Sequence, residues 1–237
     1  MNYEGYIKVN HEAKLIVFDW DGTLMDSEAR IVACMEAAFG DAEVPSPGRA
    51  AIRNIIGLGL REAVASLLPR ADDALWKQIG ERYRYHFLDD NRIPSELFPD
   101  ACHVLDTLRA QGYLLAVATG KSRRGLNAEL VATGLHEKFH ATRCADETFS
   151  KPHPAMLQQL MAELGVAGQA TLMVGDTEYD LQMAHNAGTP ALAVCFGVHG
   201  RERLLRHVPL GCIDRLLDIP PWLERQTAVP GAAQRST

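Results

Sequence analysis

The stretch from Leu15 to Glu28, LIVFDWDGTLMDSE, constrains the fold more than any other part of the chain. Its four apolar residues, Leu15 to Phe18, run directly into Asp19 and Asp21, and a Gly-Thr turn follows. A short, uninterrupted apolar run that ends at a turn is typical of a strand buried on both faces. In open α/β sheets, ligands bind just beyond the carboxyl ends of such strands. The stretch therefore predicts a buried parallel strand that delivers two carboxylates to a ligand site.

The two carboxylates of Asp19 and Asp21 would repel each other unless a positive charge lay between or beside them. Mg²⁺ takes oxygen ligands, and proteins usually hold it with only one or two carboxylates. We therefore expect a Mg²⁺ site at the end of this strand.

The residues that follow the first strand contain only helical patterns. Apolar residues recur at helical spacing in three segments, the first with Ser27 as its expected N-cap: Ser27 to Phe39, about Arg49 to Leu68 with a break at Gly57-Leu58-Gly59, and about Asp72 to Leu88. No strand-like alternation occurs between Met25 and Asp90. We therefore predict an all-helical block over residues 25–93, inserted after the first strand.

From Pro94 onward, apolar runs that end at glycine or polar residues alternate with helical segments. The predicted strands are Tyr113 to Ala118, Phe139 to Cys144, Thr171 to Val174 and Ala191 to Phe196. Strands separated by helices of this length form right-handed βαβ units and a parallel sheet. The predicted fold class is therefore α/β, with a discontinuous core at 15–24 and 94–225 and polar ends at 1–14 and 226–237.

Composition excludes several classes of function. The net charge of −6 argues against nucleic-acid binding and against a polybasic membrane patch. No apolar run approaches the roughly 20 residues of a membrane span, and no signal sequence precedes the first strand. The five cysteines are scattered and form no C-x-x-C pair, which favours reduced thiols over disulfides or a zinc site. We expect a cytoplasmic protein that is a monomer or a weak dimer.

Chemically active residues follow several of the predicted strands. Thr119-Gly120-Lys121 follows the second strand, Lys151 lies in the loop after the third, and Gly175-Asp176 follows the fourth, with Asp180 one helical turn later. Because the carboxyl ends of parallel strands lie along one edge of a sheet, these residues should converge on Asp19 and Asp21. Carboxylates, a lysine and a hydroxyl together suit phosphoryl transfer, in which the main demand is electrostatic.

These residues resemble the four motifs of the haloacid dehalogenase superfamily. The motifs are DWDGTL at 19–24, Thr119, Lys151 and GDTEYD at 175–180. The inserted helical block resembles the helical cap of the branch that contains phosphoglycolate phosphatases and β-phosphoglucomutases. The resemblance covers roughly Leu15 to Leu223, and it implies a Rossmann-like parallel-sheet core with an inserted all-helical cap.

The resemblance implies roles for the acidic residues. Asp19 would be the nucleophile that forms an aspartyl-phosphate, and Asp21 would be the general acid for the leaving alcohol and then the base for the attacking water. Asp19, Asp176 and the backbone carbonyl of Asp21 would hold Mg²⁺, with Asp180 supporting the metal site or binding the ion. An acid at the position of Asp21 also distinguishes the phosphatases from the dehalogenases of the same fold.

The resemblance also implies that Thr119 hydrogen-bonds the phosphate and that Lys151 pairs with Asp19 and the phosphate. A general acid needs a raised pKa and a carboxylate nucleophile a lowered one. A lysine and a metal beside Asp19, with Asp21 farther from both, would separate the pKa values of the two groups in that direction.

Two positions depart from the family pattern. Trp20 is larger than the residue usual between the two aspartates, and its side chain should point away from the chemistry. Gly120 stands where many phosphatases of this branch have Asn, so only its backbone is available to the substrate or phosphate. Lys121 either compensates electrostatically for that loss or is solvated.

The helical block should determine specificity, because it would close over the core site and exclude water. The break at Gly57 is either a hinge whose backbone approaches the substrate or a plain helix–helix turn. Arg53 and Arg61 flank it, and they either meet an anionic substrate or are solvated helix charges.

The residues and the resemblance together predict a Mg²⁺-dependent phosphatase of a small, anionic phosphate monoester, with phosphoglycolate phosphatase as the nearest named activity. The expected partner is a small phosphorylated metabolite, not a nucleic acid or a membrane. One alternative is a sugar phosphomutase on the same scaffold. Another is a non-catalytic module in which phosphorylated Asp19 acts as a signal, although a cap argues against an accessible signalling aspartate.

Overall fold

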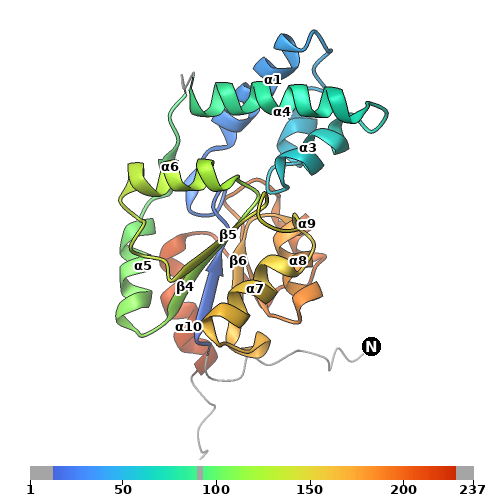
Figure 1. Ribbon diagram of the computed structural model, residues 1–237. Helices are drawn as coiled ribbons and strands as arrows, with labels where there is room; N and C mark the ends of the chain where they lie inside the picture. Colours follow the sequence, from blue (N-terminus) through green and yellow to red (C-terminus); the bar gives the residue numbers. More distant parts are fainter. Residues whose placement is uncertain (1–12, 90–92, 228–237) are drawn as a thin grey trace, which may run out of the picture.

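The computed structural model describes residues 13–89 and 93–227, so the predicted polar ends lie almost wholly outside the described residues. An α/β core forms the lower part of the molecule in Figure 1, and a helical cap lies above it. Within the described ranges, no helix is long and apolar enough to cross a bilayer.

The core is built on a six-stranded parallel sheet with the order β5-β4-β1-β6-β7-β8. The predicted first strand, β1 (Leu15–Phe18), lies inside this sheet and pairs with β4 on one side and β6 on the other. All four of its side chains are fully buried, as expected of a strand covered on both faces. The other strands are β4 (Leu114–Thr119), β5 (Ala141–Cys144), β6 (Thr171–Gly175), β7 (Ala191–Val194) and β8 (Gly211–Ile213).

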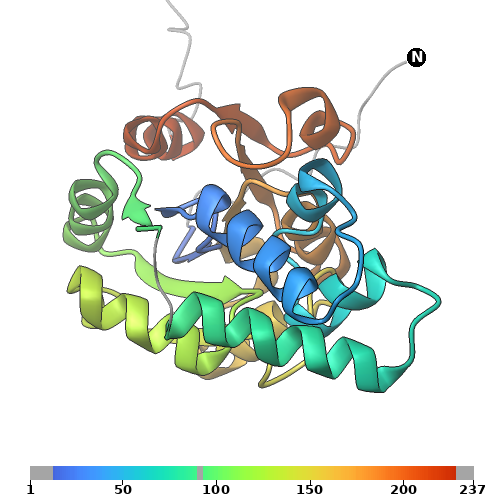
Figure 2. The ribbon, with the colours of Figure 1, turned by 90° about the horizontal axis from the view of Figure 1, so that it is seen from above.

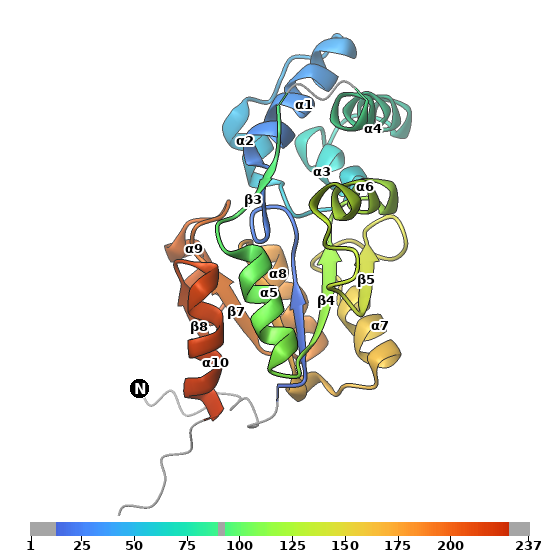
Figure 3. The same ribbon diagram turned by 90° about the vertical axis from the view of Figure 1, so that its left-hand side faces the viewer.

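Helices cover both faces of the sheet (Figure 3). Ile16 and Phe18 pack in one apolar cluster with α5 (Ala101–Ala110), α6 (Arg123–Thr133) and α10 (Ile219–Thr227). Leu15 and Val17 pack in the opposite cluster with α7 (Ala155–Leu164), α8 (Glu178–Ala187) and α9 (Arg201–Leu205). Short 3₁₀ turns at Gly168–Ala170 and Leu216–Asp218 complete the connections. The side-chain alternation of β1 thus divides the core into two layers.

The cap consists of α1 (Glu28–Asp41), α2 (Arg49–Asn54), α3 (Leu60–Leu67) and α4 (Asp73–Leu88). Its longest helices, α1 and α4, lie side by side when seen from above (Figure 2). Met35, Phe39 and Ile79 belong to a cap cluster that is separate from the two core clusters. The cap therefore has a hydrophobic core of its own, in which full burial of each such side chain contributes about 1.5–3 kcal/mol to stability.

Two short elements differ from the sequence prediction. Residues Met25–Asp26 (β2) and Glu96–Leu97 (β3) form an antiparallel ribbon where the two linkers between cap and core meet. The sixth core strand, β8, was also not expected. Two or three residues are too few to show strand periodicity, and only the partner strand in space identifies them.

The cysteine prediction was wrong for one pair. Cys195, which follows β7, forms a disulfide with Cys212 in β8, and their Cα atoms are 6.4 Å apart. The register places Cys212 opposite Ala193, so Cys195, two residues beyond Ala193, is a diagonal neighbour of Cys212. Sequence spacing could not reveal this pairing because β8 itself was not predicted. Cys34, Cys102 and Cys144 are free thiols, as expected.

Candidate active site

Three carboxylates meet at the carboxyl edge of the sheet. Asp19 follows β1 and Asp176 follows β6, which are adjacent parallel strands. Asp180 lies in the first turn of α8 and forms a capping box with Thr177. One oxygen from each carboxylate lies within 4.8 Å of the others, and all three residues are buried. The convergence expected from the parallel topology is therefore present.

Lys151 lies between two of these carboxylates. Its Nζ is 2.6 Å from Asp19 Oδ1 and 2.6 Å from Asp180 Oδ1, and the side chain is fully buried. Burial alone would lower the pKa of Lys151, but Asp180 and Asp19 raise it above the ordinary value. Lys151 is therefore a permanent cation within the acidic cluster.

The charge of the cluster fits a divalent cation. Burial raises the pKa of Asp19 well above its usual range even though Lys151 opposes the shift, so Lys151 alone does not give Asp19 the lowered pKa expected of a nucleophile. Burial and the nearby Asp180 charge raise the pKa of Asp176 to about 7. Three ionised carboxylates and one ammonium would leave two negative charges without compensation. Among the described residues, Asp19 Oδ2 is buried without a hydrogen-bond partner, and a hard cation such as Mg²⁺ would satisfy it.

Asp176 is fixed in place by the turn after β1 and by the segment after β7. Thr23 Oγ1 donates to Asp176 Oδ1 at 2.9 Å, and the amide of Val198 donates to Oδ2 at 2.8 Å. Gly22 has a φ of +87°, and a Cβ there would lie only 2.2 Å from Asp176 Oδ2. The Gly-Thr turn therefore allows the Asp19 loop to pack directly against the carboxylate of the neighbouring strand.

Asp21 does not share the environment of Asp19. Its side chain is not part of the cluster of Asp19, Asp176 and Asp180. Asp21 Oδ1 instead accepts a hydrogen bond from Ser27 Oγ at 2.6 Å, and Lys121 Nζ lies 2.8 Å and 3.1 Å from its two oxygens. Ser27 precedes α1 as predicted, but its hydroxyl binds Asp21 and does not cap the helix. The two aspartates of the DWD motif thus occupy separate polar environments.

The second environment includes Lys121, for which the sequence left two alternatives, and Glu129, whose importance the sequence analysis missed. Lys121 Nζ also pairs with Glu129 Oε1 at 3.1 Å, and only 7% of the Lys121 side chain is exposed. Glu129 in turn accepts a hydrogen bond from the indole N–H of Trp20. Lys121 is therefore buried and paired, not solvated. One signal was available, since Glu129 lies at helical spacing between the apolar residues Leu126 and Leu130 on the inner side of α6.

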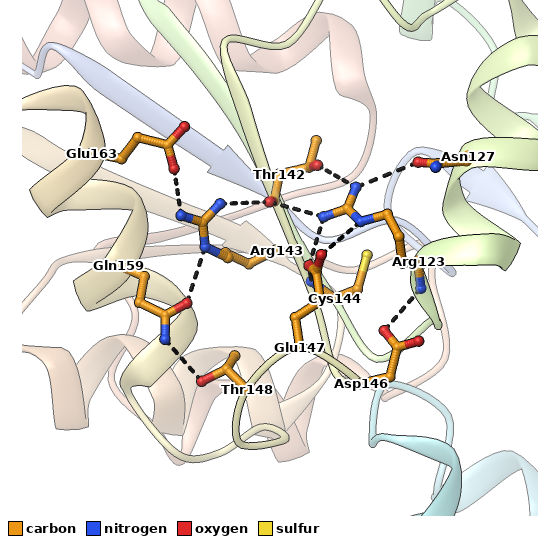
Figure 4. A network of polar contacts seen from close by, with 10 residues as sticks. All are labelled: Arg123, Asn127, Thr142, Arg143, Cys144, Asp146, Glu147, Thr148, Gln159 and Glu163. Atoms are coloured by element: carbon orange, nitrogen blue, oxygen red, sulfur yellow. Dashed lines mark hydrogen bonds and ion pairs between the residues drawn. The ribbon is translucent and has the colours of Figure 1, made fainter.

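A polar network positions the loop that carries Lys151 (Figure 4). The amide of Arg123, at the start of α6, donates to Asp146 Oδ1 at 2.8 Å, and its guanidinium binds the carboxylate of Glu147 and the hydroxyl of Thr142. Glu147 Oε2 also accepts from the amide of Cys144 at 2.9 Å. The end of β5 and the loop that follows are therefore fixed to the start of α6, close to Lys121.

Thr119 is the last residue of β4 and is fully buried. Its Oγ1 accepts a hydrogen bond from the amide of Lys121 at 3.1 Å. A hydroxyl can donate one hydrogen bond while it accepts another, so the proton of Thr119 can still be donated to a ligand.

A cavity of about 80 Å³ lies between the cap and the core, next to Asp19 and Asp21. Gly57 and Gly120, whose backbones were considered as contacts to the substrate, line this cavity. A Cβ on Gly120 would lie 2.4 Å from the carbonyl oxygen of Leu58, so the cap loop packs directly on the core backbone there. Gly57 has a φ of +103° and packs against Thr177. The break at residues 57–59 is therefore a contact loop between cap and core.

Further hydrogen bonds join cap and core around this loop. The amide of Gly59 donates to Ser150 Oγ at 2.7 Å, next to Lys151. The hydroxyl of Tyr179 donates to the carbonyl of Asn54 at 2.9 Å, and Arg203 binds the side-chain oxygen of Asn54. The cap therefore rests on the catalytic edge of the sheet.

The structure does not bring the two cap arginines to this cavity. Arg53 pairs with Glu28 at 2.8 Å and Arg61 pairs with Asp73 at 3.1 Å, and neither lines the space beside Asp21. Helical spacing could not decide which way these side chains point, because both also fit an exposed helix face.

Comparisons with known proteins agree with this geometry. Residues 16–194 match the family model described as haloacid dehalogenase-like hydrolase. The chain is 37% identical over 211 residues to the "probable phosphatase IndB" of Dickeya dadantii, with 86% of this chain and 91% of that protein covered. It is 30% identical over 198 residues to the phosphoglycolate phosphatase of Mannheimia succiniciproducens, with 80% and 88% covered.

A solved structure has the same architecture. The crystal structure of a "predicted phosphoglycolate phosphatase" from Haemophilus somnus superimposes with a TM-score of 0.80 at 25% identity, and the match covers 90% of this chain and 98% of that one. The family model, the relatives and the acidic cluster beside Lys151 lead to one conclusion. The chain belongs to the haloacid dehalogenase-like hydrolase family.

Proposed function

We propose that this protein hydrolyses a small phosphate monoester in a Mg²⁺-dependent reaction, through an aspartyl-phosphate on Asp19. The observation that carries the proposal is the environment of Asp19. Its Oδ1 pairs with Lys151, while its buried Oδ2 has no hydrogen-bond partner among the described residues. A buried carboxylate beside a lysine and two further carboxylates suits nucleophilic attack on a phosphoryl group held by cations.

In the first step, an oxygen of Asp19 attacks phosphorus, and the bond between phosphorus and the ester oxygen breaks. Asp21 gives its proton to the leaving oxygen, so the alcohol departs neutral. In the second step, Asp21 takes a proton from water as the water oxygen attacks phosphorus. The bond from phosphorus to Asp19 then breaks, inorganic phosphate leaves, and Asp21 is again protonated.

The remaining motif residues would bind the phosphoryl group. Lys151 lies beside Asp19 and would bind the oxygens of the phosphoryl group that Asp19 attacks. The Thr119 hydroxyl would donate a hydrogen bond to the same group, and the backbone of Gly120 borders the cavity. These donors would stabilise charge on the equatorial oxygens as it develops in the transition state.

Asp19, Asp176 and the carbonyl of Asp21 would hold Mg²⁺, with Asp180 beside them. Bound there, the ion would screen the phosphate charge from the carboxylates and polarise the phosphoryl oxygens. Asp180 would keep Lys151 in place whether or not the ion is bound, because the two are already paired.

The burial of Asp19 argues against the alternative of a non-catalytic signalling module. Asp19 is only 1% exposed beneath the cap, which disfavours a signalling aspartate that must be read by a partner. Phosphoglycolate is the first substrate to assay, because relatives at about 30% identity are named phosphoglycolate phosphatases. Release of inorganic phosphate would distinguish a hydrolase from a mutase, which returns the phosphate to a sugar.

The test is phosphate release from p-nitrophenyl phosphate with and without Mg²⁺ by the native protein and by Asp19→Asn. We expect Mg²⁺-dependent release by the native protein and a loss of at least about 10³-fold in the variant. Asp106→Asn, which changes an exposed aspartate, is the matched control. Normal Mg²⁺-dependent activity of Asp19→Asn would show that Asp19 is not the nucleophile.

A further inference from the structure

The cavity beside Asp21 has mainly apolar walls. The cap contributes Ile31 and Met35 from α1, Ile56 and Leu58 from the loop before α3, and Phe87 from α4. Its volume of about 80 Å³ is several times the roughly 10–15 Å³ that one water requires. The leaving group of a phosphate ester bound at Asp19 would occupy this space, because Asp21 would give it a proton there. The walls therefore favour a compact apolar group.

Lys121 is the buried cation in the wall, but its charge is already compensated. Its ammonium pairs with Asp21 at 2.8 Å and with Glu129 at 3.1 Å, and it lies 4.3 Å from the centre of the Phe87 ring. With Asp21 protonated as the general acid, the negative charge of Glu129 still compensates that of Lys121, and the group is neutral. A carboxylate brought into the cavity would thus meet repulsion from Glu129 together with attraction to Lys121.

The other cations near the cavity do not replace Lys121. Arg84 belongs to the lining but is an exposed residue. Arg53 and Arg61 are engaged elsewhere, as described above. Tyr83 also lines the space, and its side chain can form a hydrogen bond but carries no charge. Among the described lining residues, no buried cation is left for an anionic leaving group.

We propose that the site selects phosphate esters whose leaving group is compact, uncharged and mainly apolar, in preference to a carboxylate-bearing group such as glycolate. This inference rests on the proposed phosphatase reaction and narrows its substrate. A carboxylate buried against these walls would lose its hydration without gaining an unshared cation. An alkyl group of the same shape would gain from burial.

Isobutyl phosphate and phosphoglycolate test the proposal directly. The two esters have the same phosphate and the same methylene, and they differ in a terminal isopropyl group or carboxylate of similar shape. We expect the kcat/KM of the native protein to be at least about tenfold higher for isobutyl phosphate, within the range that a matched hydrophobic pocket gives. Equal or greater kcat/KM for phosphoglycolate would overturn the proposal.

Glu129→Gln gives a second measurement. The amide oxygen can still accept from Trp20, but one negative charge next to Lys121 is removed. We expect the preference for isobutyl phosphate to fall several-fold as Lys121 becomes available to a carboxylate. Glu163→Gln, which changes a distant exposed carboxylate paired with Arg143, should leave the preference unchanged. An unchanged preference in Glu129→Gln would contradict the role assigned to charge compensation.

Arg84→Gln examines the remaining cation. If it selectively lowers the activity on phosphoglycolate, then Arg84 binds that carboxylate and the proposal is wrong. An equal effect on both esters supports it.

Asp19→Asn measured with the same esters distinguishes a failure of the leaving-group inference from a failure of the proposed function. Asp19-dependent hydrolysis that prefers phosphoglycolate overturns only the leaving-group inference, whereas hydrolysis that does not need Asp19 overturns the proposed function as well.

Discussion

The contact between Gly120 and the cap loop gives the most direct prediction. A Cβ added to Gly120 would lie 2.4 Å from the carbonyl oxygen of Leu58 and 2.6 Å from that of Gly57, whereas ordinary contact begins at 3.4 Å. The obstructing atoms belong to the backbone, so no side-chain rotation relieves the clash. In Gly120→Ala, the cap loop and the core must therefore separate by about 1 Å.

A displacement of about 1 Å in residues that border the substrate can cost about 10²-fold in rate. That factor corresponds to about 2.7 kcal/mol of transition-state stabilisation. We expect kcat/KM for p-nitrophenyl phosphate to fall by about this amount in Gly120→Ala. The core should remain folded, because Gly120 does not have a positive φ and lies just after β4, outside the strand itself.

Gly40→Ala is the control for this experiment. Gly40 lies in helix α1 of the cap, and a Cβ there would meet no atom within 4 Å. The substitution should leave kcat/KM unchanged and stabilise the helix by about 0.5–1 kcal/mol. If Gly120→Ala is folded and keeps the native kcat/KM, the loop at Gly57-Leu58 does not need to rest on Gly120 during turnover, and the argument from steric contact is refuted.

Two further predictions concern the charge of the catalytic cluster. Lys151→Ala should lower the free energy of unfolding, measured in urea, by about 3–5 kcal/mol, because two buried carboxylates lose their cation. The control Lys138→Ala, at an exposed ion pair, should lower it by less than about 1 kcal/mol. Equal losses in the two variants would contradict this reasoning. Burial raises the pKa of Asp176 to about 7, whereas an unfolded aspartate has a pKa of about 3.9. The folded protein therefore binds a proton that the unfolded chain releases, so stability in EDTA should decrease as the pH rises from about 4 to about 7. Thermal melts should show this trend, with greater stabilisation by Mg²⁺ at pH 7.5 than at pH 5, and a trend of the same size in Asp176→Asn would contradict the assignment.

The sequence was sufficient to predict the core of the fold because its signals are local. Leu15 to Phe18 form an apolar run that must be buried, and polar residues follow each of several such runs. Parallel pairing then requires Asp19, Asp176 and Lys151 to meet at one edge, which the structure confirms. No distance information was needed, since topology alone brings these residues together.

The remaining features depend on side-chain direction and strand register, which a single sequence does not encode locally. Glu129 was not singled out from the sequence, and only its contacts with Lys121 and Trp20 show that it belongs to the site. The Cys195–Cys212 pair depends on the register of β7 with β8. The sequence left open whether Arg53 meets the substrate or is a solvated helix charge, and the structure pairs it with Glu28 in the same cap.

The hydrogen bond from Ser27 to Asp21 limits which caps can be exchanged between this protein and its relatives. Ser27 belongs to the cap segment, whereas Asp21 belongs to the core motif, and their oxygens are 2.6 Å apart. Phe87 of the cap likewise covers the Lys121 ammonium that pairs with Asp21. The cap thus supplies part of the immediate environment of the residue proposed to transfer protons. A chimera that grafts a relative's cap onto this core would exchange that environment together with the pocket walls, so donor caps should be chosen for a hydroxyl at the position of Ser27 as well as for the substrate they admit.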